Sequence, residues 1–306
     1  MRKCFYYGVR LLLLFLIVAS LTPATMGAQP NGLVIMITDF GVKDFYVGAM
    51  KGAMYKVFPQ AKIDEISHGV SKFDIKEGAY TLAKAAPEYP TGTVFVGVID
   101  PGVGTQRKPI AMKTQNGNYF VAPDNGLLTL IGDSMGVAEV REITNRDVMR
   151  QDVQSSTFHG RDIFGPAAAH LAKGFAFERI GPVLEEYVQL PISFAKIVDD
   201  AIVGQIEVID EYGNVITNIR PDLFEKLELQ RGQTIEVEFS HHRSVVCKYV
   251  KAYGDAPVGS GVGLFGSGGV FEVAVNQGNL AKELKLEGTE KCIVRKGSDE
   301  DRSPQR

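Results

Sequence analysis

The sequence Thr-Val-Phe-Val-Gly-Val-Ile-Asp, residues 93–100, predicts the fold more strongly than any other stretch of the chain. Apart from one glycine, residues 94–99 are β-branched or aromatic, a pattern typical of a strand that is buried on both faces. Asp100 ends this strand, and the glycine-rich turn 101–107 follows. Because a carboxylate beside a buried strand is costly unless it is paired or solvated, Asp100 is a first candidate for a functional residue.

Strand-like and helix-like patterns alternate on both sides of this stretch. Short apolar runs predict strands, and apolar residues at i, i+3 and i+4 predict helices. The predicted strands are residues 33–38, 62–67, 93–99, 110–113 and 119–121, and the predicted helices are residues 45–58, 75–86, 126–131 and 161–172. This alternation predicts an α/β domain with a largely parallel sheet over residues 29–195.

The pattern changes near residue 196 to short strands separated by Gly, Asp and Asn turns. Strict alternation is clearest in Thr-Ile-Glu-Val-Glu-Phe, residues 234–239. The predicted strands are residues 202–209, 214–218, 234–239, 245–250 and 270–275. They predict a smaller, all-β, barrel-like domain over residues 196–295, and the charged residues 296–306 are expected to form a frayed tail.

The composition is that of an ordinary globular protein, with 45% apolar and 23% charged residues. The formal net charge is −3 and no Lys/Arg run occurs, which argues against a nucleic-acid-binding protein. The five histidines and three cysteines show no zinc-ligand spacing, so we expect no structural metal. Cys247 and Cys292 are too far apart in sequence for a zinc ribbon, and whether they pair is left open.

Residues 1–28 resemble a secretory signal peptide. Arg2, Lys3 and Arg10 are basic, residues 11–21 are apolar, and small residues lie within 25–28. The alternative is an uncleaved anchor, but an 11-residue apolar run is short against the about 20 residues that span a bilayer. We therefore expect an exported protein, periplasmic or extracellular, without a stable membrane span after cleavage.

Polar residues also lie where α/β sheets bind ligands, beyond the carboxyl ends of strands. Asp39 follows the first strand and suits either the two hydroxyls of a ribose or an Asx-turn, whereas Asp44 suits a cap of the next helix. Asp100 and Arg107 can pair across the turn, in a site or as a structural clasp. His159 precedes a helix, whose dipole favours a neutral imidazole that can act as a base.

Two further strings carry weaker information. Gly-Val-Gly-Leu-Phe-Gly, residues 261–266, matches the dinucleotide-binding pattern by letter, but no βαβ unit surrounds it. Close approach of a glycine-lined backbone to a ligand or another chain is the better interpretation. Residues 210–214, Asp-Glu-Tyr-Gly-Asn, predict a hairpin turn.

Seven strings along the chain, taken together, resemble one family. They are ITDFGxxDxYVGxMKG (37–52), FDIKEGA (73–79), VIDPGVGTxR (98–107), APDNGLLT (122–129), STFHGRDIFGPAAAHLA (156–172), IDxxGNxxTNI (209–219) and AVNQGNLA (274–281). In this order they resemble the S-adenosyl-L-methionine hydroxide adenosyltransferases, relatives of the fluorinases and chlorinases. The likeness extends over about residues 33–290.

The resemblance implies an N-terminal α/β domain, a C-terminal β-barrel and a homotrimer with active sites between subunits. It implies a reaction without metal or cofactor, in which the substrate S-adenosylmethionine and water give adenosine and L-methionine. Asp100, Arg107 and His159 match the residues that position and activate water. The matching substrate-binding residues are Asp39 for the ribose, Asp44 and Asp210 for the methionine ammonium, Asn214 for the adenine, Phe73 and Phe158 for the pocket wall, and Ser267 and Gln277 on the segment that crosses the interface.

Two alternatives to hydrolysis remain at this stage. One is an exported protein that binds adenosine or S-adenosylmethionine without turnover. Export fits a hydrolase poorly, since S-adenosylmethionine is made in the cytosol. A halogenase is the other alternative, but fluorinases have Tyr at the position of Asp100 and Ser at that of Gly160. A carboxylate at position 100 would repel a halide and can hydrogen-bond water, so hydroxide is the favoured nucleophile.

Overall fold

Strand β3, Val94–Val98, lies inside a six-stranded sheet in the computed structural model, which describes residues 29–152 and 155–297. The strand order is β2-β1-β3-β5-β4-β6. Strands β2, β1, β3 and β5 run parallel, and β4 is antiparallel to both of its neighbours. The remaining bounds are β1 Leu33–Thr38, β2 Lys62–Ser67, β4 Pro109–Thr114, β5 Tyr119–Pro123 and β6 Val137–Glu142. The predicted, largely parallel sheet is confirmed.

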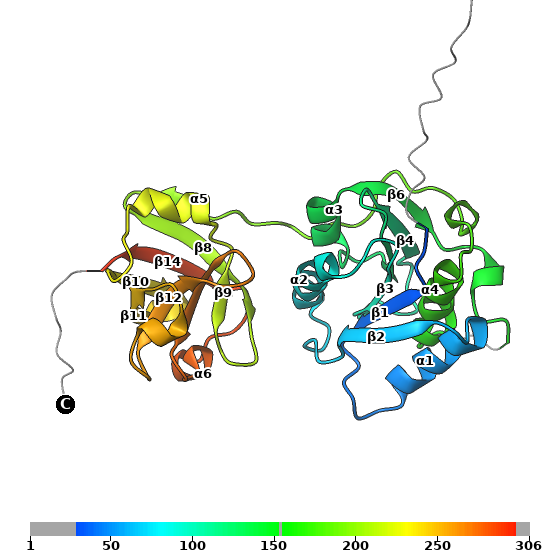
Figure 1. The fold of residues 1–306 in the computed structure, drawn as a ribbon, viewed down its shortest axis with the longest axis horizontal. Coiled ribbons are helices and arrows are strands. Elements are labelled where there is room, and N and C mark those ends of the chain that lie inside the picture. Colours follow the sequence, from blue (N-terminus) through cyan, green and yellow to red (C-terminus); the bar gives the residue numbers. More distant parts are fainter. Residues whose placement is uncertain (1–28, 153–154, 298–306) are drawn as a thin grey trace, which may run out of the picture.

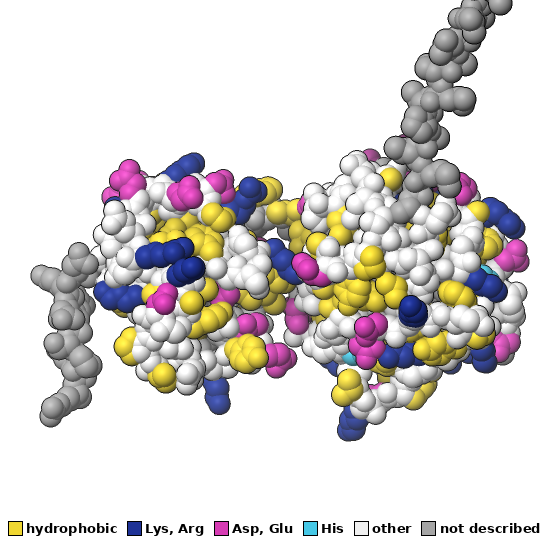
Figure 2. Space-filling model, viewed as in Figure 1, with side chains coloured by type: hydrophobic (Ala, Val, Ile, Leu, Met, Phe, Trp, Pro, Cys, Tyr) yellow, Lys and Arg dark blue, Asp and Glu magenta, His cyan; other side chains and the backbone are white. Residues whose placement is uncertain are grey.

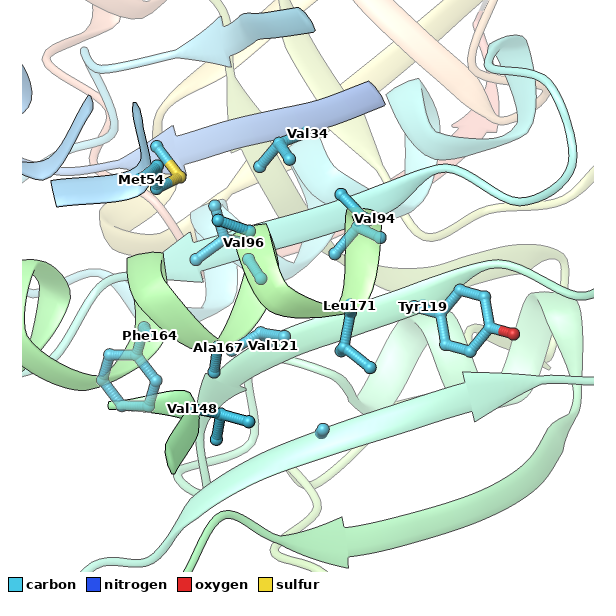
Figure 3. Packing of buried hydrophobic residues seen from close by; sticks show 14 of the residues in the cluster. Val34, Met54, Val94, Val96, Tyr119, Val121, Val148, Phe164, Ala167 and Leu171 are labelled. Atoms are coloured by element: carbon cyan, nitrogen blue, oxygen red, sulfur yellow. The ribbon is translucent and has the colours of Figure 1, made fainter. Parts of the chain in front are cut away.

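Helices cover both faces of this sheet. Helices α1 (Tyr46–Val57) and α4 (Gly165–Ala172) pack on one face, and α2 (Ile75–Ala85) and α3 (Thr129–Met135) pack on the other. Figure 3 shows how Leu171 and Ala167 of α4 lie over the valines of β3 and β5. Since both faces of β3 are covered, its apolar run has no polar alternation.

Two helix starts differ in their capping. Asp74 caps α2, because its Oδ1 accepts a hydrogen bond from the Glu77 amide at 2.9 Å. The predicted cap of α1 by Asp44 is wrong: the N-cap position is Phe45, and no side chain bonds there. Asp44 lies one residue earlier and lines a cavity instead.

The predicted helix 161–172 is interrupted. Its first turn, Gly160–Phe164, is π-helical, and the regular helix α4 begins only at Gly165. The Gly165 amide bonds to the Gly160 carbonyl, five residues back. Pro166 has no amide hydrogen to continue the regular pattern, which explains why the wider turn is tolerated here.

The C-terminal region is a closed barrel of seven strands. Pairing of β14 with β8 closes the ring β14-β10-β11-β12-β13-β9-β8, and the short strand β7 adds to the edge of β8. Two short helices lie between barrel strands in the sequence: α5 follows β9, and α6 follows β13. The bounds are β7 Lys196–Val198, β8 Ala201–Ile209, β9 Val215–Thr217, α5 Pro221–Phe224, β10 Thr234–Phe239, β11 Ser244–Tyr249, β12 Gly261–Phe265, β13 Phe271–Val275, α6 Leu280–Leu284 and β14 Lys291–Lys296.

Strand β6 of the sheet and the three barrel strands β7, β12 and β14 were not predicted. Strand β12 is the glycine-rich string that matched the dinucleotide pattern, and it pairs antiparallel with β13. A Cβ on Gly263 would lie 2.5 Å from Ile235 and 2.7 Å from Phe271, so this glycine permits close packing inside the barrel. The turn predicted at residues 210–214 does join the antiparallel strands β8 and β9.

Cys247 and Cys292 are buried free thiols in the barrel wall. They lie on opposite sides of β10, with Cys247 opposite Ile235 and Cys292 opposite Phe239. Burial raises the pKa of each thiol to about 12, so neither is poised to react. The two cysteines therefore form no disulfide bond with each other in this structure.

Figure 1 shows the α/β region and the barrel as two bodies joined by an extended segment. Helix α2 also contacts the barrel, through Lys76–Glu207 at 3.5 Å and a 2.6 Å hydrogen bond from Lys84 Nζ to the Gly268 carbonyl. The domain boundary predicted after residue 195 stays a prediction, and it lies one residue before β7.

On the face shown in Figure 2, Lys and Arg side chains are interspersed with Asp and Glu. Within the described part of the chain, every helix is too short or too polar to cross a bilayer. The predicted leader 1–28 and most of the predicted tail, 298–306, lie outside the described residues, while Lys296 is the last residue of β14.

The stacked rings of Phe95 and Phe120 test the importance of β3. Their centroids are 4.7 Å apart and both side chains are fully buried. Phe95→Ala is expected to lower the free energy of unfolding by about 3–5 kcal/mol, because it leaves a cavity beside the central strand. Urea unfolding checks this. The matched control is Phe194→Ala, whose side chain is 79% exposed and whose loss should cost about 0.5 kcal/mol or less. Equal losses for the two variants would contradict the assignment.

Candidate active site

The parallel pairing of β1 and β3 brings two carboxylates to one edge of the sheet. Thr38 is paired with Val98, so Asp39 and Asp100 both lie just beyond the carboxyl ends of neighbouring parallel strands. A cavity of about 630 Å³ opens at this edge. It is lined by Asp39, Phe40, Asp44, Phe45, Tyr46, Lys72, Phe73, Val98, Asp100, Val103, Ser155, Thr157, Phe158, His159, Gly160 and Arg161.

Arg107 joins Asp100 to His159. Its Nε donates to Asp100 Oδ1 at 2.9 Å and one terminal nitrogen donates to Asp100 Oδ2 at 2.5 Å. The same terminal nitrogen lies 2.7 Å from His159 Nδ1. The side chains of Asp100 and Arg107 are only 5% and 9% exposed, and the guanidinium lies over the Phe164 ring. The pairing predicted for Asp100 and Arg107 is therefore present, and it borders a cavity.

The contact with Arg107 fixes the protonation of His159. A guanidinium only donates hydrogen bonds, so Nδ1 must be the acceptor and the neutral ring carries its hydrogen on Nε2. Burial, followed by the positive charge of Arg107, lowers the pKa of His159 below its ordinary value. His159 is thus a neutral donor through Nε2, whereas the sequence suggested a base.

The glycine-rich turn after Asp100 is required by close packing. Gly104 has φ +79°, and a Cβ at this position would lie 2.6 Å from the Ser156 carbonyl oxygen. Only glycine lets the turn approach the 155–159 segment this closely. This approach brings Arg107 within reach of His159, although the two belong to separate loops.

Asp39 is held from the neighbouring loop. Its Oδ2 accepts the Phe73 amide at 2.9 Å, and its backbone carbonyl accepts a bond from Lys72 Nζ. The Gly41 amide bonds to the His68 carbonyl, which excludes the Asx-turn that the sequence also allowed. Phe73 has φ +69°, a strained conformation for a residue with a side chain and one that clusters at functional sites.

Aromatic side chains form one wall of the cavity. The Phe158 ring lies edge-on to Phe40, Phe45 and Tyr46, with centroids 5.2–6.2 Å apart. Phe45 is 66% and Phe73 67% exposed, so this wall presents apolar rings at its mouth. Tyr46, the first residue of α1, also lies in this wall.

The predicted site residues of the barrel lie elsewhere. Asp210 and Asn214 are in the β8–β9 turn, where Asn214 Nδ2 donates to Asp210 Oδ2 at 2.8 Å. Ser267 is in the turn between β12 and β13, and Gln277 follows β13 with φ +57°. Among the described residues of this single chain, none of these four lines the cavity that contains Asp39 and Asp100.

Sequence reasoning missed several residues of the cavity. Lys72 and Arg161 line it, together with the hydroxyl-bearing Ser155 and Thr157. Thr157 lies within the string 156–172 without a role of its own, and Ser155 directly precedes that string. No sequence pattern indicated a role for Lys72, and only the structure shows its hydrogen bond to the Asp39 carbonyl. In residues 29–152 and 155–297, no three His, Cys, Asp or Glu side chains gather as a metal site would require.

The chain is similar to proteins of known and unknown activity. It is 35% identical over 271 residues to a protein of Salinispora tropica named (R)-S-adenosyl-L-methionine hydrolase, covering 88% of this chain and 99% of that protein. It is 28% identical over 289 residues to a fluorinase of Nocardia brasiliensis, covering 86% and 95%. An uncharacterised Thermotoga maritima protein of solved structure superposes with TM-score 0.82 at 38% identity, covering 86% of this chain and all of that one.

Family models give the same answer for both parts of the chain. The model of the SAM hydroxide adenosyltransferase N-terminal domain matches residues 34–181, which contain the cavity. The model of the C-terminal domain of the same family matches residues 204–293, within the barrel. The matches follow each other in the expected order over most of the chain. The protein therefore belongs to the SAM hydroxide adenosyltransferase family.

Proposed function

We propose that this protein hydrolyses S-adenosyl-L-methionine to adenosine and L-methionine. The observation that carries the proposal is the hydrogen-bonded series Asp100–Arg107–His159 beside a cavity that Asp39 also lines. Relatives that match nearly their full length are named for this hydrolysis, and the family supports it. These relatives are named for the (R) sulfonium epimer, so the epimer that this protein hydrolyses has to be tested as well.

The reaction depends mainly on the alignment of the nucleophile with the bond that breaks, because the leaving group is already activated. The oxygen of water attacks ribose C5′ while the C5′–S bond breaks, and the bonding electron pair returns to sulfur. The sulfonium leaves as the neutral thioether of methionine, so the leaving group needs no Lewis acid. The protein has to place one water in line with the C5′–S bond and take one of its protons.

The series of three residues suits this task. Arg107 occupies one lone pair on each Asp100 oxygen, which keeps the carboxylate fixed and leaves further lone pairs for the proton of a water. His159, neutral and protonated on Nε2, donates to the oxygen of that water and stabilises developing hydroxide. In this assignment Asp100 accepts the proton and His159 orients the nucleophile.

The remaining cavity residues suit the two ends of the substrate. The carboxylate of Asp39, a residue that is only 7% exposed, is anchored by the Phe73 amide and suits the ribose hydroxyls. Asp44 suits the methionine ammonium. The aromatic wall around Phe158 excludes water from the reacting centre. An anionic Asp100 beside the nucleophile position disfavours a halide, which makes a halogenase the weaker alternative.

A homotrimer would complete the site. The cavity has no contribution from Asp210, Asn214, Ser267 or Gln277, and its mouth exposes apolar rings. A barrel from a neighbouring copy, placed over this mouth, would bury those rings and bring the second half of the substrate site. Export through residues 1–28 is likewise part of the proposal, supported by the basic and apolar pattern of that segment.

The first test is turnover by the mature chain, residues 29–306, in chloride-free buffer with each sulfonium epimer separately. Equimolar adenosine and methionine are expected, and in H₂¹⁸O the label should enter the 5′-hydroxyl of adenosine. His159→Ala and Asp100→Asn should each lower kcat about 10²-fold or more. His242→Ala is the matched control, because that side chain is 97% exposed in the barrel and should leave turnover unchanged.

Two outcomes would overturn hydrolysis. Saturable binding of S-adenosylmethionine without products would make the chain a binding protein. Conversion to 5′-chloro-5′-deoxyadenosine when chloride is added, in place of adenosine, would make it a halogenase.

The second test is the pH dependence of kcat/KM. Because the pKa of His159 is lowered from 6.5, the ring stays neutral and active as the pH falls through 6.5, and activity should be lost only at more acidic pH. In Arg107→Gln, one cause of the lowered pKa is removed, so the acidic limb of the residual activity should move toward pH 6.5. A wild-type limb centred above pH 6.5 would refute this assignment.

The third test mixes two inactive variants, His159→Ala and Asp210→Asn, by refolding them together. The asparagine keeps an acceptor for the Tyr212 and Asn214 amides, so the turn is preserved. If each site combines one α/β region with the neighbouring barrel, about one quarter of wild-type activity should return in a random trimer. If each chain carries its own complete site, no activity returns.

A further inference from the structure

The side chain of Asp162 is fully buried, and its carboxylate is hydrogen-bonded to Arg161, to Arg150 and to the Ser155 amide. It lies in the π-helical turn Gly160–Phe164, directly after His159. A charged carboxylate is rarely buried completely unless several donors compensate it. Its donors therefore indicate what the carboxylate holds in place.

Three segments donate to the Asp162 carboxylate. Arg161 binds it with two nitrogens, Nε at 2.6 Å from Oδ1 and a terminal nitrogen at 2.8 Å from Oδ2. The Ser155 amide donates to Oδ2 at 2.7 Å, and Arg150 approaches Oδ1 at 3.4 Å. Burial alone would raise the pKa of Asp162, but the bonds from Arg161 and the Ser155 amide outweigh it and lower that pKa, so the group is ionised.

Two of these donors, Arg161 and Ser155, belong to residues that line the substrate cavity. The guanidinium of Arg161 lies 5.0 Å from the centroid of the Phe158 ring, the central ring of the aromatic wall. Ser155 lines the cavity, and its hydroxyl accepts the Thr157 amide at 3.1 Å. One carboxylate thus fixes both the ring and the hydroxyl-bearing rim of the cavity.

The backbone of Asp162 strengthens the same connection. Its carbonyl accepts the Arg150 amide at 2.8 Å, and its amide donates to the Phe158 carbonyl at 3.2 Å. The π turn is therefore bonded through its backbone both to Arg150 and to Phe158, the residue that directly precedes His159. Turns of this kind recur at functional sites, where they re-aim side chains.

We propose that Asp162 is a positioning residue that shapes the substrate-binding wall through Arg161, Phe158 and Ser155. The proposal rests on the proposed function, since the ligand is S-adenosylmethionine. It assigns to Asp162 an effect on substrate binding that is separate from the activation of water. Loss of its charge releases the Arg161 fork and loosens the wall, while the bonds among Asp100, Arg107 and His159 persist.

Asp162→Asn tests this in the full mature chain. KM for S-adenosylmethionine is expected to rise about tenfold or more with kcat changed less than about threefold, because uniform binding is lost. The charge of Asp162 is one of the causes that raise the pKa of His159, so the acidic limb of the pH profile should move to lower pH in this variant and not toward pH 6.5. A purely structural role would instead lower the thermal midpoint and the active fraction, so that kcat falls and KM is unchanged, and that result would overturn the proposal.

Arg161→Gln is the second variant, for the case in which Asp162→Asn does not fold. It keeps the carboxylate bonded to the Ser155 amide and should raise KM in the same direction. Asp152→Asn is the matched control: Asp152 also pairs with Arg150, but its side chain is 61% exposed and outside the cavity, so KM should not change. An equal rise in KM for the control would overturn the proposal.

Calorimetric binding of adenosine and of S-adenosylmethionine separates the two hypotheses. If wild-type protein binds but does not turn over, the hydrolase proposal fails while the role of Asp162 is still measured as a Kd. Weaker binding by Asp162→Asn than by Asp152→Asn supports the positioning role, and equal affinity refutes it.

Discussion

The candidate site depends on a single guanidinium. Arg107 bonds to both oxygens of Asp100 and to Nδ1 of His159, with its flat face over the Phe164 ring. It compensates the buried carboxylate, which would otherwise be costly, and it decides which nitrogen of His159 carries hydrogen. Asp100, Arg107 and His159 therefore form one hydrogen-bonded unit.

Backbone geometry makes that unit possible. The register between β1 and β3 places Asp39 and Asp100 at one sheet edge. Gly104 lets the turn after Asp100 pack against Ser156, and the π turn that follows His159 is held by the Asp162 carboxylate. Each feature is a local irregularity, and together they form the cavity wall. Every residue that lines the cavity belongs to the α/β region of the chain. We therefore proposed that the barrel of a second copy completes the site.

Much of this architecture was predictable, for definite reasons. Strand β3 is apolar because both of its faces are covered, and β10 alternates because one of its faces is solvated. Strands β6, β7 and β14 were missed because they are short or charged, and β12 because its glycines resemble a loop. The cap by Asp44 was wrong because a residue type suited to capping does not ensure that the backbone presents it to the helix.

The sequence by itself determined the fold class, the family resemblance and the chemical identity of the candidate residues, since these depend on periodicity and on ordered strings. Only the tertiary structure decided how those residues act. It made His159 a donor, tied Asp39 to the Phe73 amide, gave Asp162 its three donors and left Asp210 outside the cavity. The physical reason is that a hydrogen bond depends on the distance and direction between atoms from distant segments, and periodicity along one segment carries no information about either.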